Sequence, residues 1–196
     1  MEMMLSLTPI FVLGLVVTLC IGTDIATMQW NGKKIQYFDR ATALFEQSED
    51  CLPGFFKGVW QNETCYMFVT AELTRSEAST FCTEGALGNG LVAIPTELHH
   101  AHIVGQIVMQ TELRASSSSS QYYWTSGENF SGLWTWGTSL EPFNYTKFWT
   151  GSTPSTGFLA LYESRSASPS PYYDWISTTS ITNAYRSICQ HFIVSR

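Results

Sequence analysis

The sequence has 196 residues, of which 44% are hydrophobic, 14% aromatic and only 13% charged, and its formal net charge is −6 at pH 7. A chain of this length forms one domain of ordinary size, alone or with an extension. The negative charge and the lack of clustered Lys and Arg argue against a nucleic-acid-binding surface, which requires a basic patch.

An apolar run, LSLTPIFVLGLVVTLCIG, occupies residues 5–22. Its place near the first residue and the small residues at its end are typical of a secretory signal peptide, so we expect residues 1–22 to be removed by cleavage after Gly22. Glu2 precedes the run and no Lys or Arg does, which departs from that pattern. A retained membrane anchor is the alternative, because a membrane-spanning helix needs about 20 apolar residues. We predict cleavage, secretion and a mature chain without a membrane span.

The cysteines and sequons agree with an extracellular location. Once residues 1–22 are removed, four cysteines remain: Cys51, Cys65, Cys82 and Cys189. An even number of cysteines in an exported chain indicates two disulfides, for which three pairings are open. Three N-glycosylation sequons begin at Asn62, Asn129 and Asn144.

Residues 23–50 are more charged than the rest of the chain and contain no cysteine. They show no strong apolar face, although residues 41–46 are compatible with a short helix. We predict an N-terminal extension of the domain that begins at Cys51.

Regular patterns begin after Cys51. Thr74 and Glu77 have the spacing of a capping box, which predicts that a helix begins there. The sequence LVAIP at 91–95 predicts a short buried strand. A partial apolar stripe in residues 96–113 predicts a second helix. Its apolar positions are Leu98, Ile103, Ile107 and Val108.

Three histidines lie in the second predicted helix: His99, His100 and His102. His99 and His102 are one turn apart, so they could share a face and bind zinc. No carboxylate or cysteine at a suitable spacing completes such a site. We therefore predict no metal and expect the histidines on a solvated helix face.

Residues 122–154 contain four of the seven tryptophans: Trp124, Trp134, Trp136 and Trp149. Large aromatic side chains bury much apolar area, and glycines between them permit tight turns. Trp134 and Trp136 flank Thr135, which predicts a strand with both rings on one face. We expect a β-rich core in this stretch.

Seven short motifs follow one another along the chain: CLPGF at 51–55, CYMF at 65–68, SEASTFC at 76–82, LVAI at 91–94, WTSG at 124–127, WTW at 134–136 and SIC at 187–189. Their order resembles that of a C-type lectin-like domain over roughly residues 51–194. The resemblance implies an α+β fold with two helices, antiparallel strands and a long irregular loop, and we assign residues 51–196 to it. It also implies the disulfide pairs Cys51–Cys65 and Cys82–Cys189.

The chain departs from the family at the calcium site. Sugar-binding members of the family follow the loop tryptophan with a tripeptide such as Glu-Pro-Asn, but after Trp149 this chain has Thr153-Pro154-Ser155. The later Trp-Asn-Asp motif corresponds to Trp175-Ile176-Ser177. Calcium takes about six to eight oxygen ligands with substantial negative charge, which these residues do not supply. We therefore expect no calcium and no other cofactor.

The second disulfide of the family is also missing. Its positions fall near Leu159 and Ser180, so we expect residues 151–175 to form an irregular loop that no disulfide holds.

Catalysis has no support, because the remaining cysteines are assigned to disulfides and no Ser-His-carboxylate or phosphate-binding glycine pattern occurs. We predict a secreted recognition protein that binds a glycan without calcium, with a role in innate recognition. The predicted ligand-binding residues are Thr153, Ser155, Tyr172, Tyr173 and Trp175. The tyrosines and Trp175 would stack on sugar rings, although a core position is the favoured alternative for Trp175. The second hypothesis is a protein–protein interaction module with no sugar binding, because one fold hosts many ligands.

Overall fold

The computed structural model describes residues 25–39, 51–58, 61–116, 119–150, 156–164 and 172–193, without the side chains of 61–63 and 172. The predicted signal peptide and the predicted short helix at 41–46 lie outside the described residues. In the described part, no helix is long and apolar enough to cross a membrane.

Two helices, a π-helical turn and a mixed sheet make up the described fold. The elements in chain order are β1 (Ile25–Trp30), β2 (Lys33–Phe38), β3 (Phe56–Gly58), β4 (Gln61–Thr74), α1 (Arg75–Thr80), the π-helical turn η2 (Phe81–Gly85), α2 (Glu97–Met109), β5 (Ser120–Phe130), β6 (Leu133–Trp136), β7 (Glu141–Pro142), β8 (Gly157–Ser164), β9 (Tyr172–Thr178) and β10 (Ala184–Phe192).

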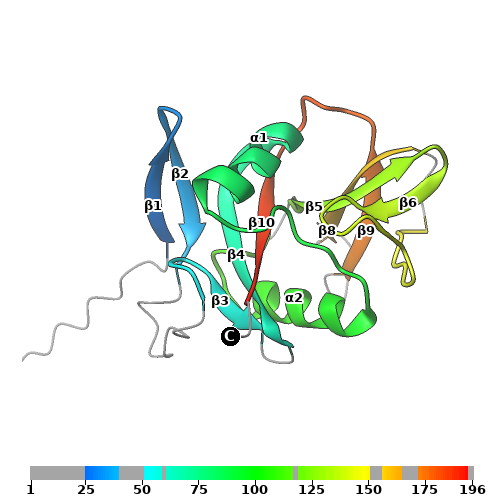
Figure 1. The fold of residues 1–196 in the computed structure, drawn as a ribbon, viewed down its shortest axis with the longest axis horizontal. Coiled ribbons are helices and arrows are strands. Elements are labelled where there is room, and N and C mark those ends of the chain that lie inside the picture. The colour runs from blue at the N-terminus through cyan, green and yellow to red at the C-terminus, as the bar shows by residue number, and fades with distance from the viewer. Residues whose placement is uncertain are drawn as a thin grey trace, which may run out of the picture.

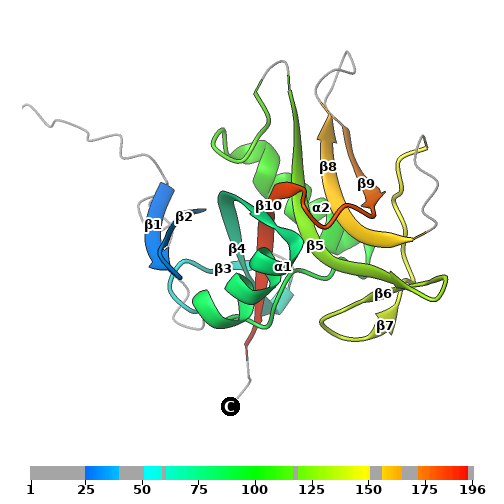
Figure 2. The ribbon, with the colours of Figure 1, turned by 90° about the horizontal axis from the view of Figure 1, so that it is seen from above.

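The strand order is β1-β2-β4-β10-β5-β6-β7, while β3 pairs with β4 and β8 pairs with both β5 and β9. β10 runs antiparallel to β4 and parallel to β5, so it joins the two halves of the sheet (Figure 1). Seen from above in Figure 2, the β1–β2 hairpin and the β8–β9 hairpin lie at opposite ends of the molecule.

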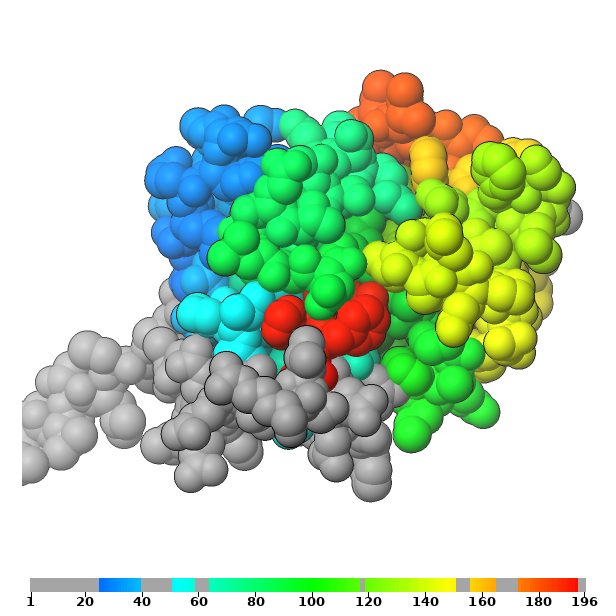
Figure 3. Space-filling view, viewed as in Figure 1, coloured from blue at the N-terminus to red at the C-terminus, as the bar shows by residue number. Residues whose placement is uncertain are grey.

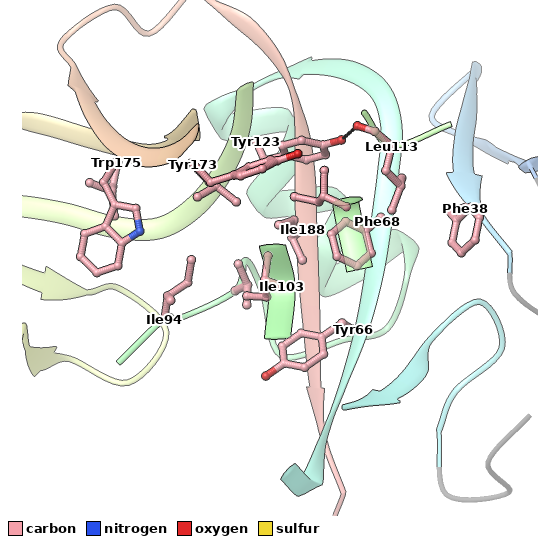
Figure 4. Close-up of a cluster of buried hydrophobic side chains, with 14 of the residues drawn as sticks. Phe38, Tyr66, Phe68, Ile94, Ile103, Leu113, Tyr123, Tyr173, Trp175 and Ile188 are labelled. Carbon is pink, nitrogen blue, oxygen red and sulfur yellow. Dashed lines mark hydrogen bonds between the residues drawn. The ribbon is translucent and has the colours of Figure 1, made fainter. Parts of the chain in front are cut away.

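Two apolar cores lie on opposite faces of the sheet, because successive strand residues point to opposite sides. On β10, Ile188 belongs to the core that contains Ile103 of α2, whereas Cys189 belongs to the core that contains Ala78 of α1. β5 divides in the same way between Tyr123 and Trp124. Figure 4 shows the first of these cores, in which the hydroxyl of Tyr123 donates a hydrogen bond to the carbonyl of Leu113. This α+β arrangement confirms the predicted fold class.

Two disulfides close the fold, and both predicted pairs are confirmed. Cys51–Cys65 spans 14 residues and holds the segment before β3 on β4. Cys82–Cys189 spans 107 residues and joins η2 to the central strand β10. Loops of about 15 and about 100 residues correspond to roughly 3 and 4.7 kcal/mol in the chain-entropy account of disulfide stabilisation.

The first helix begins as predicted. Thr74 caps α1: its side-chain oxygen accepts from the backbone N–H of Glu77 at 3.4 Å, and the Glu77 carboxylate accepts from the backbone N–H of Thr74 at 3.0 Å. These reciprocal bonds satisfy two backbone donors that lack partners within the helix.

Part of the predicted N-terminal extension is a regular β-hairpin. β1 and β2 pair antiparallel around Asn31 and Gly32, which both have positive φ (47° and 75°), as a tight two-residue hairpin turn requires. β2 then joins β4 through the pair Tyr37–Val69. Residues 25–38 therefore extend the sheet.

Two predictions about strands were wrong. Residues 91–95 are buried or half-buried, but only Leu91 forms a bridge, to Cys189, and no strand follows. The region 151–175, predicted as an irregular loop, contains all of β8 and the first four residues of β9, and these two strands pair antiparallel. Leu159, Ala160 and Leu161 are buried there because β8 lies inside the sheet, between β5 and β9.

The second helix is confirmed as α2, with Thr96 as its N-cap. Its predicted stripe is only half correct: Ile103 and Ile107 are buried, whereas Leu98 and Val108 are exposed. The prediction that its histidines lie on a solvated face was wrong for two of them, because His100 and His102 are buried against the sheet.

Candidate functional site

Three stacked tyrosines cross the sheet on the face that carries Trp124. Tyr185 of β10 lies beside Tyr122 of β5, with ring centroids 4.7 Å apart, and Tyr122 lies beside Tyr162 of β8 at 5.0 Å. The interplanar angles of 19° and 25° show that the rings stack face to face. Strand register produces the row, since Tyr122 is directly opposite Tyr162. All three side chains are half-buried, so the row borders solvent.

Beyond Tyr162, the same sheet face continues with Asp174 of β9 and with Lys147 of the segment beside β9. Tyr162 is opposite Asp174, whose carboxylate lies 3.9 Å from the ammonium group of Lys147. Burial raises the pKa of Asp174 above its ordinary value, and Lys147 offsets part of that rise. The sheet face therefore passes from aromatic rings to a charged pair.

Residues 147–149 run alongside β9 like a short additional strand. Backbone bonds from Trp175 N–H to Lys147 O (2.7 Å) and from Trp149 N–H to Trp175 O (2.9 Å) hold the segment. Side chains alternate in such a segment, so Phe148 packs against Trp175 while Trp149 reaches Tyr162, with ring centroids 6.3 Å apart. The Trp149 side chain remains 38% exposed. An accessible indole thus stands beside the tyrosine row.

Polar groups surround these rings. The Asn183 amide donates to the hydroxyl of Tyr185 at 2.7 Å, and the hydroxyls of Ser120 and Tyr162 lie 3.2 Å apart. Burial raises the pKa of Tyr185 above its ordinary value, and the hydrogen bond from Asn183 offsets part of that rise. We call this surface the aromatic strip. It consists of Tyr122, Lys147, Trp149, Tyr162, Asp174 and Tyr185.

Only two of the five predicted ligand residues, Tyr173 and Trp175, have described side chains, and both are buried. Thr153 and Ser155 lie outside the described residues, and Tyr172 is described only as backbone in β9. Tyr173 is buried and its hydroxyl donates to the Glu163 carboxylate at 3.1 Å.

Trp175 is fully buried, and its indole N–H donates to Nδ1 of His100 at 3.2 Å. Its ring packs against four other aromatic side chains: Trp136, Phe143, Tyr145 and Phe148. Figure 4 shows both Trp175 and Tyr173 inside the core. Trp175 therefore has the core position favoured from the sequence and presents no ring face to a sugar.

The described residues near β8 and β9 do not fit a calcium ion. Ile176 packs against a core, and the Glu163 carboxylate is buried, where it accepts from the Ala115 N–H at 2.7 Å as well as from Tyr173. Asp174 faces the ammonium group of Lys147 instead. No group of three or more His, Cys, Asp or Glu that could hold a metal occurs among the residues described.

Two of the predicted glycosylation sites can be placed. Asn144 is exposed between β7 and the segment at 147–149. Asn129 is half-buried at the end of β5, where its side-chain oxygen accepts from the Gly132 N–H at 3.0 Å. The side chain of Asn62 lies outside the description.

No protein-family model and no curated protein matches the sequence. Similarity is found among solved structures. Human lithostathine has a TM-score of 0.57 at 18% identity, and the match covers 79% of this chain and 99% of lithostathine. The fold is that of a C-type lectin-like domain.

Two further C-type lectin-like structures support this assignment. A calcium-independent type II antifreeze protein has a TM-score of 0.52 at 14% identity, over 74% of this chain and 95% of its own. Ovocleidin-17 of the Gallus gallus eggshell has a TM-score of 0.51 at 18% identity, over 74% and 99%. At these identities the similarity establishes the C-type lectin-like fold and transfers no activity.

Most of the aromatic strip was missed from the sequence, although Trp149 was singled out. Tyr122 carried a weak signal, because it alternates with Trp124 along one strand. Tyr162 and Tyr185 carried none, because their place beside Tyr122 depends on how distant strands pair within the C-type lectin-like fold.

Proposed function

We propose that this chain is a secreted recognition protein that binds a glycan without calcium, through the aromatic strip. The observation that carries the proposal is the accessible indole of Trp149, held beside stacked tyrosines and the Lys147–Asp174 pair. Ligand sites commonly combine apolar surface with a few polar groups that fix orientation.

The strip offers both kinds of contact that a sugar uses. The apolar face of a pyranose ring packs on an aromatic side chain, so Trp149 is the expected anchor. Lys147 donates hydrogen bonds and Asp174 accepts them, which suits the hydroxyl groups of a sugar. Because the Lys147 side chain is half-exposed and its ammonium group lies 3.9 Å from Asp174, it can turn toward a ligand at little cost.

Calcium independence is part of the proposal. Its support is the chemistry of the donors: Ile176 and Ser177 replace amide and carboxylate, and Asp174 already has a cationic neighbour. Secretion is supported by two disulfides, which persist in oxidising compartments. The proposed activity is binding and includes no catalysis.

The test is a glycan array probed with the mature protein in EDTA, followed by titration of the best glycan with two variants. We expect Trp149→Ala to weaken binding about tenfold or more, since loss of a buried aromatic anchor costs about 2 kcal/mol or more. Leu98→Ala is the matched control, because Leu98 is an exposed apolar residue on α2, away from the strip. Binding that requires calcium, or that Trp149→Ala leaves intact, would contradict the proposal.

A second candidate function, protein recognition, is favoured by the tip of the β5–β6 hairpin. Phe130 and Leu133 face each other across the turn and are largely exposed. Exposed apolar pairs of this kind suit a protein partner. A photo-cross-linker at position 130 that captures one defined extracellular protein, while one at position 98 does not, would favour this function if the array shows no glycan binding.

A further inference from the structure

A pocket separate from the aromatic strip lies between α1, the start of β8 and the connection after β9. Its volume is about 310 Å³, and the residues that line it are Arg75, Ser76, Ser79, Thr80, Phe158 and Ile181. Figure 3 shows the orange connection that contains Ile181 beside the green-cyan α1, at the top of the molecule. The pocket shares no residue with the strip.

Arg75 is the unusual member of this lining. Only 11% of its side chain is exposed, and its Nε atom has no hydrogen-bond partner among the described residues. Arg75 forms an ion pair with Glu128, whose Oε2 lies 3.8 Å from a terminal guanidinium nitrogen, beyond hydrogen-bonding distance. A guanidinium group carries five donors and stays protonated at neutral pH. Arg75 therefore has a buried donor, Nε, without a hydrogen-bond partner among the described residues, and a positive charge that the ion pair with Glu128 offsets only in part.

The rest of the lining suits a small organic molecule. The Arg75 guanidinium lies 5.0 Å from the centre of the Phe158 ring, which fixes it over that face of the pocket. The hydroxyl of Thr80 donates to the carbonyl of Ser76 at 3.0 Å, and its oxygen remains able to accept. Ile181 is mostly exposed and adds an apolar wall. The volume is at the lower end of the range for small-molecule pockets, about 300–1,000 Å³.

We propose that this pocket binds the acidic group of a monosaccharide-sized organic anion, either a carboxylate or a sulfate ester. Both groups present a compact set of charged oxygens that matches the donors of a guanidinium fork. The serine and threonine hydroxyls bind neighbouring polar groups of the ligand, and Ile181 packs against its carbon skeleton. This site does not depend on glycan binding at the aromatic strip.

Glu128 gives the proposal a second, opposite test. The Glu128 carboxylate partly neutralises the positive charge of Arg75 and repels an incoming anion. An anionic ligand must therefore compete with Glu128 for the guanidinium group. Removing the negative charge at position 128 should therefore strengthen anion binding, whereas removing the positive charge at position 75 should weaken it. A pocket that only tolerates a small molecule would not show this pair of opposite effects.

The experiment is a calorimetric or NMR titration of the folded chain with glucuronate, glucose 6-sulfate and neutral glucose. We expect one or both anions to bind and glucose to bind at least about tenfold more weakly, because a charge-assisted hydrogen bond is lost. Comparing the two anions tells whether the pocket takes carboxylate or sulfate.

The variants then assign the binding to Arg75. Arg75→Gln should weaken anion binding about tenfold or more, Arg75→Lys should retain part of it, and Glu128→Gln should strengthen it about threefold or more. Lys34→Gln, at an exposed position of β2 outside both proposed sites, is the control for general loss of charge and should change the affinity less than about twofold. Thermal melts establish that each variant is folded. No binding of either anion, equal binding of glucose, or an affinity that Arg75→Gln leaves unchanged would overturn the proposal.

Discussion

His100 makes the stability of this fold sensitive to acid. It lies buried on α2, between the rings of Trp175 and Tyr145, and its Nδ1 accepts the indole N–H of Trp175 at 3.2 Å. An imidazole that accepts at Nδ1 must be unprotonated there. Burial lowers the pKa of His100 to about 4, and the neighbouring positive charge of Lys147 acts in the same direction. The folded protein therefore holds this side chain neutral.

The direction and size of the effect follow from linkage. The pKa of His100 is about 6.5 in the unfolded chain and about 4 in the folded protein, so between these values the unfolded state binds more protons. The contribution of neutral His100 to the free energy of unfolding is fully present above pH 6.5 and is lost as the pH falls toward 4. A difference of about 2.5 pH units corresponds to roughly 3 kcal/mol at 1.36 kcal/mol per unit.

The assay is urea unfolding at pH 7 and pH 4.5, for the native chain and for His100→Gln. Glutamine can accept from the Trp175 indole but does not titrate, so the variant should lose about 2–3 kcal/mol less than the native chain between the two pH values. Carboxylates that titrate in this range are present in both proteins and cancel. His99→Gln is the control. The His99 imidazole is more exposed than that of His100, so its removal should change the loss of unfolding free energy between pH 7 and pH 4.5 less. Equal acid losses in the native chain and in His100→Gln would refute the reasoning.

Two further predictions concern the disulfides and calcium. Cys189→Ser removes the bridge that spans 107 residues, so it should cost about 4–5 kcal/mol and abolish secretion, whereas Cys51→Ser/Cys65→Ser should cost about 3 kcal/mol. Secretion yield and melting temperature measure both, and normal secretion of Cys189→Ser would show that the bridge is dispensable. Thermal melts in millimolar calcium and in EDTA should overlay within about one degree, because an occupied site at 100 times Kd would add about 2.7 kcal/mol. An upward shift in calcium that Asp174→Asn removes would restore a calcium site to this face.

The fold class was predictable because its signals are local and ordered. The capping box at Thr74 depends on residues three apart, and the disulfide pairs followed from the order of seven motifs. The β1–β2 hairpin also carried a local signal, Asn31-Gly32, which favours a two-residue turn. It was missed because the interpretation of residues 23–50 rested on their charge, although exposed Thr27 and Gln29 alternate with half-buried Met28 and Trp30.

The β8–β9 hairpin was missed for a different reason. The Ser- and Pro-rich residues 165–171 suggested irregular structure for the whole region, but GFLALY at 157–162 is a continuous apolar run of the kind that a strand buried on both faces requires. At Leu91 the error was the opposite one, because a strand was predicted where the structure has none. Its apolar surroundings reflect burial in an extended segment that makes one bridge, and burial alone does not produce a strand.

The candidate site was the least predictable part. Trp175 and Tyr173 belong to an aromatic sequence that suits either a core or a surface, and only the alternation along β9 places them inward. Arg75 looks like an ordinary charged residue of a first helical turn. The surroundings of its guanidinium depend on Phe158 and Glu128, which the sheet brings there from two distant strands.

The position of β10 also determines when this fold can form during synthesis. β4 and β5 do not pair with each other in the strand order, and each instead pairs with β10, the last strand of the described chain. A nascent chain that has reached Thr178 already contains every other strand, yet its two halves have no shared ladder and Cys82 has no partner. A ribosome that stalls before residue 184 therefore leaves two exposed sheet edges and a reactive thiol, which are the features that quality-control chaperones and thiol oxidoreductases recognise.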